Sequence, residues 1–328
     1  MPRSLLENQA FRLQFAGHDT FPLRYGWLKK AVDAVGEVEG RGGDTNAVFT
    51  SDSAIAAFGV GRNMVTAMRH WALASGVLEM KGGDVRRGGR LVVSEIGKMV
   101  FGRLGDPYME DPGTLWLIHW RLASRPGRAT TWYWAFNEQN EPDFSRDLLR
   151  THLSRRCAEL REAKLLRESR ISDSTLKRDI ECFVRTYAPT GPGGRGPVDE
   201  HLESPLCELA LLQPLDQGRF RMRRGPKPSL PDEVFLFALC EFWVDLHPGR
   251  ASFSVEALTH EPGSPGRVFL LDEESVADRL AAIADLTQGA LRWDEASGIR
   301  QVLAHNIAAA SPQPRLRERY ERLQKVAA

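Results

Sequence analysis

The chain has 328 residues, of which 42% are hydrophobic and 27% charged, and its formal net charge is +1. This composition is typical of a globular protein long enough for two or three domains, and it excludes a disordered chain. The N-terminus lacks a signal-peptide pattern and no apolar run approaches the roughly 18 residues of a membrane span, so we expect a cytoplasmic protein with no membrane partner.

Charge is distributed unevenly along the chain. Residues 41–103 contain nine Lys/Arg and five Asp/Glu, and residues 145–195 contain twelve and seven. Residues 229–310 reverse this balance, with five bases and thirteen acids. This separation is expected of a face that binds a polyanion such as double-stranded DNA, and equally of a mixed-charge surface that folds back on itself.

The first predicted elements lie between residues 25 and 104. The pattern predicts a helix over 25–36, a short helix over 53–60, a glycine turn, a longer helix over 64–76, and two strands joined by a Gly- and Arg-rich loop. Asn63 is the predicted cap of the longer helix, and Gly76 its end. This order is that of a winged helix-turn-helix, which we place at residues 1–105.

In a winged helix-turn-helix, the longer helix reads a DNA groove and the hairpin contacts the backbone. We expect the groove face to carry Arg62, Asn63, Thr66, Arg69 and His70. The hairpin would grip phosphates through Arg86, Arg87 and Arg90. Winged helices also serve as protein-docking modules, so the pattern alone leaves both roles open.

Residues 106–200 are predicted to form a helical middle domain. Trp116, Trp120, Trp132 and Trp134 are interpreted as core residues, although tryptophans also stack on unpaired bases. Two basic amphipathic helices follow, over 144–166 and 172–187, and the second is expected to expose Lys177 and Arg178. The four cysteines form no C-x-x-C pair and are interpreted as reduced core residues.

Residues 201–328 are predicted to form a C-terminal domain that repeats the winged-helix order and ends in a basic tail. A basic loop near its start contains Arg223 and Arg224, which would extend a DNA-binding track. The fold class expected for the whole chain is therefore mostly α, within the α+β class.

No complete catalytic motif is present, and no metal ligands are assigned. The catalytic candidates are His18, Asp19, Arg24, Asp272 and Glu273. Neighbours on an extended segment point in opposite directions, so His18 and Asp19 are not expected to pair with each other. As alternatives to catalysis, Asp19 or Thr20 would cap a helix near Phe21, and Arg24 would pair with a carboxylate or a phosphate. Asp272 would cap the helix whose first turn contains Glu273.

Several segments together resemble an uncharacterised-domain family that lies beside genes for DNA phosphorothioation and phage defence, in the Ssp system. They are GHDTFPLRYGWLKKA, GVGRNMVTAMRHWALASGVLE, STLKRDIECFVRTY, SPLCELALL, RGPKPSLP, SPGRVFLLDE and GIRQV. The resemblance implies a DNA-nicking activity that opens the strand for sulfur insertion. It also implies two partners, a cysteine desulfurase and a PAPS-reductase-like sulfur-transfer protein.

We therefore expect a DNA-binding subunit of a phosphorothioate-modification system that nicks the DNA backbone. A nickase of this kind would use Mg²⁺ or Mn²⁺, and no other cofactor is expected. The alternative is a non-catalytic DNA-binding adaptor or transcriptional regulator, which the lack of a catalytic motif favours. A homo-oligomer is compatible with both functions.

Overall fold

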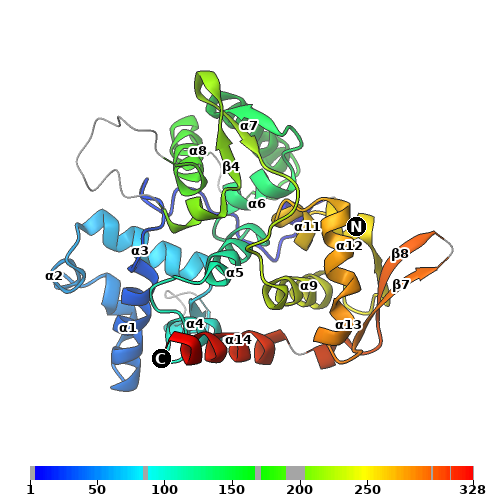
Figure 1. Cartoon of the computed structure of the whole chain (residues 1–328). Helices are drawn as coiled ribbons and strands as arrows, with labels where there is room; N and C mark the ends of the chain where they lie inside the picture. The colour runs from blue at the N-terminus through cyan, green and yellow to red at the C-terminus, as the bar shows by residue number, and fades with distance from the viewer. Residues whose placement is uncertain are drawn as a thin grey trace.

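Helices dominate the structure, and three small antiparallel sheets accompany them (Figure 1). The computed structural model describes residues 4–83, 88–166, 171–189, 204–296, 298–310 and 312–327. Its buried apolar side chains form one contiguous core cluster. The predicted α+β class is confirmed. Among the helices so described, none has the length and apolar character needed to span a bilayer.

The N-terminal part follows the predicted order of elements. Strands β1 and β2 pair antiparallel, with Leu78 opposite Val93 and Lys81 opposite Arg90. The elements are η1 (Leu5–Glu7), α1 (Trp27–Gly40), η2 (Thr45–Phe49), α2 (Ala54–Phe58), α3 (Arg62–Ala74), β1 (Leu78–Lys81), β2 (Arg90–Val93) and α4 (Glu95–Phe101).

The two ends of α3 differ in how well local sequence predicts them. Helix α3 begins at Arg62 after Gly61, so Asn63 lies inside the helix and the cap predicted there is wrong. At the other end, Gly76 has a φ of +70°, the left-handed conformation that glycine adopts without strain. A Cβ at Gly76 would also lie 2.7 Å from a guanidinium nitrogen of Arg121. The positive φ is therefore the main reason for glycine there, because the end of the flexible Arg121 side chain could move away from a Cβ.

The middle part is not purely helical, because three short strands accompany its helices. Strand β3 pairs with β5, which also pairs with β4, giving the order β3-β5-β4. The elements are α5 (Pro112–Ala123), α6 (Thr130–Asn137), β3 (Asp143–Ser145), α7 (Arg146–Glu162), α8 (Asp173–Tyr187), η5 (Pro205–Leu209), β4 (Leu212–Pro214), η6 (Asp216–Gly218) and β5 (Arg219–Met222). The core role of the four tryptophans is confirmed: Trp116, Trp120, Trp132 and Trp134 are all buried.

The C-terminal part has a sheet with the corresponding order, β6-β8-β7. Its last helix, α14, packs against α9 and α4 (Figure 1). The elements are α9 (Asp232–Leu246), β6 (Ser252–Ser254), α10 (Val255–His260), α11 (Pro265–Val268), α12 (Glu273–Ala281), α13 (Ile283–Leu286), β7 (Leu291–Ala296), β8 (Ile299–Ala304), η7 (Ile307–Ala310) and α14 (Pro312–Ala327).

The middle and C-terminal sheets begin with the same local device. Each first strand places a phenylalanine in the core, Phe144 or Phe253, followed by a serine that caps the next helix. The backbone N–H of Leu148 donates to Ser145 Oγ at 3.2 Å, and that of Ala257 donates to Ser254 Oγ at 3.1 Å. The short stretches DFSRDLL and SFSVEAL are thus a structural repeat. Sequence periodicity misses it because each strand has only three residues.

The basic C-terminal tail is bound to the junction predicted near residue 106. Arg319 forms an ion pair with Asp111, with N···O distances of 2.6 and 3.0 Å. The Tyr320 hydroxyl lies 3.1 Å from Thr114 Oγ1. Helix α14 therefore ties the end of the chain to its first third, and the domain boundaries near residues 105 and 200 stay predictions.

Candidate nucleic-acid interface

Helix α3 buries one face and leaves the other in solvent. Its inner side contains Met68 and Trp71, which are both fully buried, and the Trp71 indole N–H donates to the Phe21 carbonyl at 2.9 Å. The three predicted groove residues of its first half are exposed on the outer side: Arg62, Asn63 and Thr66.

The exposed face of α3 keeps its positive charge available. Arg62 approaches Asp52 at 3.2 Å, but both side chains are largely in solvent, where such a pair contributes little. Arg90, at the start of β2, is also exposed. The other two hairpin arginines of the prediction, Arg86 and Arg87, lie outside the described residues.

His70 is buried, whereas the helical pattern had placed it on the groove face. The reason is tertiary: the segment around Gly17 covers the second half of α3 so closely that a Cβ at Gly17 would lie 2.3 Å from His70 Nδ1. Burial lowers the pKa of His70 to about 3, assisted by the positive charges of His18, Arg128 and Arg69. His70 is therefore a neutral core histidine at neutral pH.

His18 finds a carboxylate, but not that of its sequence neighbour. Its Nε2 lies 2.8 Å from Oδ1 of Asp179 on α8. The same carboxylate accepts from the backbone N–H of Ala16 at 2.6 Å and from the Thr131 hydroxyl at 2.5 Å. The His18 ring also stacks on Trp71. We call Ala16, His18, Thr131 and Asp179 the buried carboxylate cluster; it joins the N-terminal segment to α6 and α8.

Two opposing effects act on the His18 pKa. Burial lowers it, whereas Cys182 and the Asp179 carboxylate raise it. The second effect is larger, and the pKa of His18 is raised to about 10. In the neutral ring, His18 Nδ1 accepts a hydrogen bond from the Thr20 backbone N–H at 3.1 Å. Protonation of Nδ1 removes this hydrogen bond. Both His18 and Asp179 are at most 1% exposed, so the pair serves to connect elements, and a catalytic role for His18 stays a prediction.

The residues next to His18 do not cap a helix. Asp19 and Thr20 have φ values of +45° and +68°, and the following helix begins only at Trp27, so the predicted cap is wrong. Arg24 is buried, with its guanidinium 5.5 Å from the centre of the Trp27 ring and 5.6 Å from that of Phe21. This guanidinium stacks on aromatic rings instead of facing solvent.

The remaining basic candidates are exposed but lie on other elements. Lys177 and Arg178 project from α8, where Lys177 is 4.0 Å from Glu181. Arg223 and Arg224 follow β5, and Arg224 donates to the Leu271 carbonyl at 2.6 Å.

The acidic candidates have structural partners. Asp272 caps α12, accepting from the Ser275 backbone N–H at 2.8 Å, which lowers the pKa of Asp272 and confirms the capping interpretation. Glu273 lies 3.1 Å from His260 Nε2 and 3.8 Å from Arg300. Within the described ranges, no three His, Cys, Asp or Glu side chains come together as a metal site.

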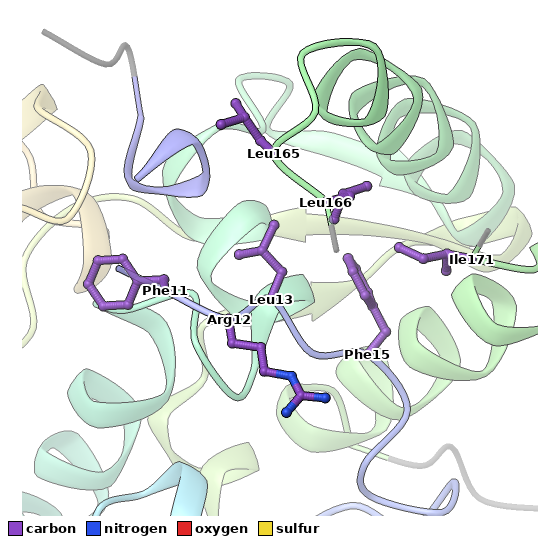
Figure 2. Close-up of a pocket in the computed structure, with 7 residues that line it drawn as sticks. All are labelled: Phe11, Arg12, Leu13, Phe15, Leu165, Leu166 and Ile171. Carbon is purple, nitrogen blue, oxygen red and sulfur yellow. The ribbon is translucent and has the colours of Figure 1, made fainter. Parts of the chain in front are cut away.

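A basic cleft that sequence reasoning missed lies beside α3. Its volume is about 660 Å³, and three arginines from distant parts of the chain line it: Arg12, Arg69 and Arg128. Of these, only Arg69 was a predicted site residue. A second pocket of about 300 Å³ adjoins it across the same N-terminal segment (Figure 2). No local motif marks this cleft, because each arginine comes from a different element.

His70 and His119 together predict how stability depends on pH. His119 is completely buried between the Tyr187 hydroxyl (2.8 Å) and the Val268 carbonyl (2.9 Å), and burial lowers its pKa to about 4. Unfolded histidines bind protons below about pH 6.5 but these two do not, so the free energy of unfolding should fall as pH drops. Each contributes a slope of about 1.4 kcal/mol per pH unit, down to its own folded pKa.

The measurement is urea unfolding at several pH values between 7 and 4.5 for the wild type and His119→Gln. Carboxylates add the same pH dependence to both proteins, so the difference isolates the histidine. The variant should show a smaller slope, with the difference reaching about 1.4 kcal/mol per pH unit near pH 5 and declining toward pH 7. Equal slopes would mean that His119 takes up its proton without unfolding.

Comparisons with known proteins agree with this architecture. The crystal structure of magnesium-ion-bound SspB superposes with a TM-score of 0.76, at 28% sequence identity over 98% of this chain and 95% of that one. Another SspB crystal structure gives a TM-score of 0.75, at 27% identity over 98% and 96%. No curated protein matched the sequence. Residues 15–320 match the model of a family described as protein of unknown function, DUF4007. The chain therefore belongs to the DUF4007 family and is SspB-like.

Proposed function

We propose that this protein is the DNA-binding component of a DNA phosphorothioate-modification system. The observation that carries the proposal is the outer face of α3, where Arg62, Asn63 and Thr66 are exposed together over a fully buried inner face. Arginine and small polar side chains on an exposed helix are the groups that contact phosphates and base edges in a groove.

The order of elements supports winged-helix units as the means of binding. Helices α2 and α3 followed by the β1–β2 hairpin have the order of a winged helix-turn-helix. The C-terminal part repeats this order with α10, α12 and the β7–β8 hairpin, and the middle part does so with α7, α8 and the β4–β5 hairpin. In this proposal α3 and α8 present the basic residues, including Lys177 and Arg178, to DNA.

The place in a modification system rests on the likeness to SspB, which extends over almost the whole chain. On this basis the partners are a cysteine desulfurase and a PAPS-reductase-like protein that delivers sulfur to DNA. The chemistry of sulfur insertion would then be shared among separate chains, with this one selecting the DNA.

Nicking is a further part of the proposal, and the described residues do not carry it alone. A hydrolytic nickase that uses Mg²⁺ needs carboxylates that hold the ion near the scissile phosphate. The acidic candidates Asp272 and Glu273 are engaged in a helix cap and in ion pairs, and no metal-binding group forms among the side chains that the structure describes. Nicking by this chain therefore stays a prediction, which the plasmid assay below tests.

Incubation of the purified protein with supercoiled plasmid at low salt tests the proposal. Retarded, intact supercoiled DNA is the result expected for a binding component without nuclease activity. Conversion to open circles with Mg²⁺ or Mn²⁺, abolished by EDTA, would assign nicking to this chain. If the plasmid migrates unchanged even at ~50 mM salt, where phosphate contacts are strong, DNA binding is ruled out.

A further inference from the structure

The basic cleft beside α3 is built from four separate parts of the chain. Residues 10–15 form one wall, and Arg69 of α3 forms another. Met80 of β1 and Gly83 just after it also line the cleft, as do Gly127 and Arg128. The volume of about 660 Å³ is within the range of roughly 300–1,000 Å³ typical of sites for small organic groups.

The N-terminal wall is held in a fixed position. The Gln14 backbone N–H donates to Thr130 Oγ1 at 2.8 Å, and the Thr130 N–H donates back to the Gln14 carbonyl at 3.4 Å. Alternate residues of this segment point in opposite directions: Figure 2 shows Leu13 and Phe15 directed toward Leu166 and Arg12 directed away from it. The side of the wall that faces away from Leu166 therefore presents the positive charge of Arg12.

The cleft is positively charged and partly aromatic. Arg12, Arg69 and Arg128 line it, and no lining residue among those described is acidic. Beside the cleft, the positive charges of Arg69 and Arg128 help to lower the pKa of the buried His70. Phe11 contributes a half-buried ring, and a Cβ at Gly127 would lie 3.7 Å from it.

We propose that this cleft holds one unpaired nucleotide of a DNA strand. The base would lie against the Phe11 ring, because aromatic stacking is favourable for every base. The arginines would bind the flanking phosphate oxygens through paired N–H···O hydrogen bonds. Neither kind of group alone indicates a nucleotide, whereas an aromatic ring and guanidinium groups within one cleft match both its base and its phosphate.

The inference rests on the proposed function and refines it. Arg69 belongs to the same helix as Arg62 and Thr66, so DNA bound along the outer face of α3 would pass beside the cleft. An unpaired nucleotide that leaves the duplex beside the cleft exposes the face of its base and its phosphates, which are the groups that the cleft would bind. Binding would therefore favour DNA with an unpaired base.

The test compares two duplexes of equal length, one fully paired and one with a single bulged 2-aminopurine. Fluorescence anisotropy gives each Kd, and 2-aminopurine fluorescence reports whether the base is stacked on protein. The wild type should bind the bulged duplex about 5- to 100-fold more tightly. Arg12→Gln with Arg128→Gln, and separately Phe11→Ala, should remove most of this preference while the affinity for paired DNA changes much less.

Arg41→Gln is the matched control. Arg41 is the C-cap residue of α1, it does not line the cleft, and its side chain is 77% exposed. It should retain the full preference. Equal affinities of the wild type for the two duplexes, or an unchanged preference in the cleft variants, would overturn the cleft proposal while leaving DNA binding intact. Failure to bind either duplex at low salt would overturn the proposed function as well. Circular dichroism of each variant separates these outcomes from unfolding.

Discussion

Replacing Asp179 by Ala is expected to lower the free energy of unfolding by about 3–5 kcal/mol. The Asp179 carboxylate accepts three hydrogen bonds within the core, from His18, Thr131 and the Ala16 backbone. Removing it leaves these buried donors without their acceptor, and His18 without its counter-charge. Because the cluster joins the N-terminal segment to α6 and α8, its loss should also loosen that segment.

Urea unfolding at pH 7 measures this effect. Asp173→Ala is the matched control, because Asp173 is in the first turn of the same helix but its side chain is 69% exposed. It should change stability by only about 0.5 kcal/mol. A loss below about 1 kcal/mol in Asp179→Ala would show that water or a rearranged side chain replaces the carboxylate.

The second large effect concerns DNA binding by the outer face of α3. Arg62→Gln combined with Arg90→Gln should weaken binding to duplex DNA about 10- to 100-fold at moderate salt, because two phosphate contacts are lost. The slope of log K against log salt concentration should become shallower by about 1.8, since each phosphate contact contributes about 0.9. Both arginines are exposed, so the substitutions should leave the fold unchanged.

The measurement is fluorescence anisotropy with a paired duplex at several salt concentrations between ~50 and ~200 mM, a range over which such contacts change affinity strongly. Arg41→Gln, at the end of α1, should behave as the wild type. If the double variant keeps both the affinity and the salt slope of the wild type, the duplex does not contact this face of α3. Lys177 and Arg178 on α8 would then be the next residues to test for DNA binding.

Local sequence predicted the elements and many of their ends. Gly76 follows α3 in a left-handed conformation, and Ser94 caps α4 by accepting from the Gly97 backbone N–H at 2.9 Å. Ser172 caps α8 in the same way, accepting from the Thr175 backbone N–H at 3.1 Å. These signals are reliable because each depends on a hydrogen bond or a backbone conformation within a few residues. The burial of the four tryptophans could also be predicted from local sequence, because the apolar face of a helix must be buried.

The same local rules failed where distant segments meet. Helical periodicity placed His70 on the groove face, but the segment around Gly17 covers it. Capping rules made Asp19 or Thr20 a helix start, whereas both residues are in a turn that directs His18 into the core. In each position the contact with a remote segment outweighs the local preference.

The sequence by itself determined the α+β class, the order of helices and hairpins in the first hundred residues, and the exposure of Arg62, Asn63 and Thr66 on α3. Only the tertiary structure decided that His18 is paired with Asp179, 161 residues away, and that Arg12, Arg69 and Arg128 line one cleft. The physical reason is the range of the interactions. Caps, turns and amphipathic faces arise from neighbours in the chain, whereas a buried ion pair or a cleft requires several elements to be packed first.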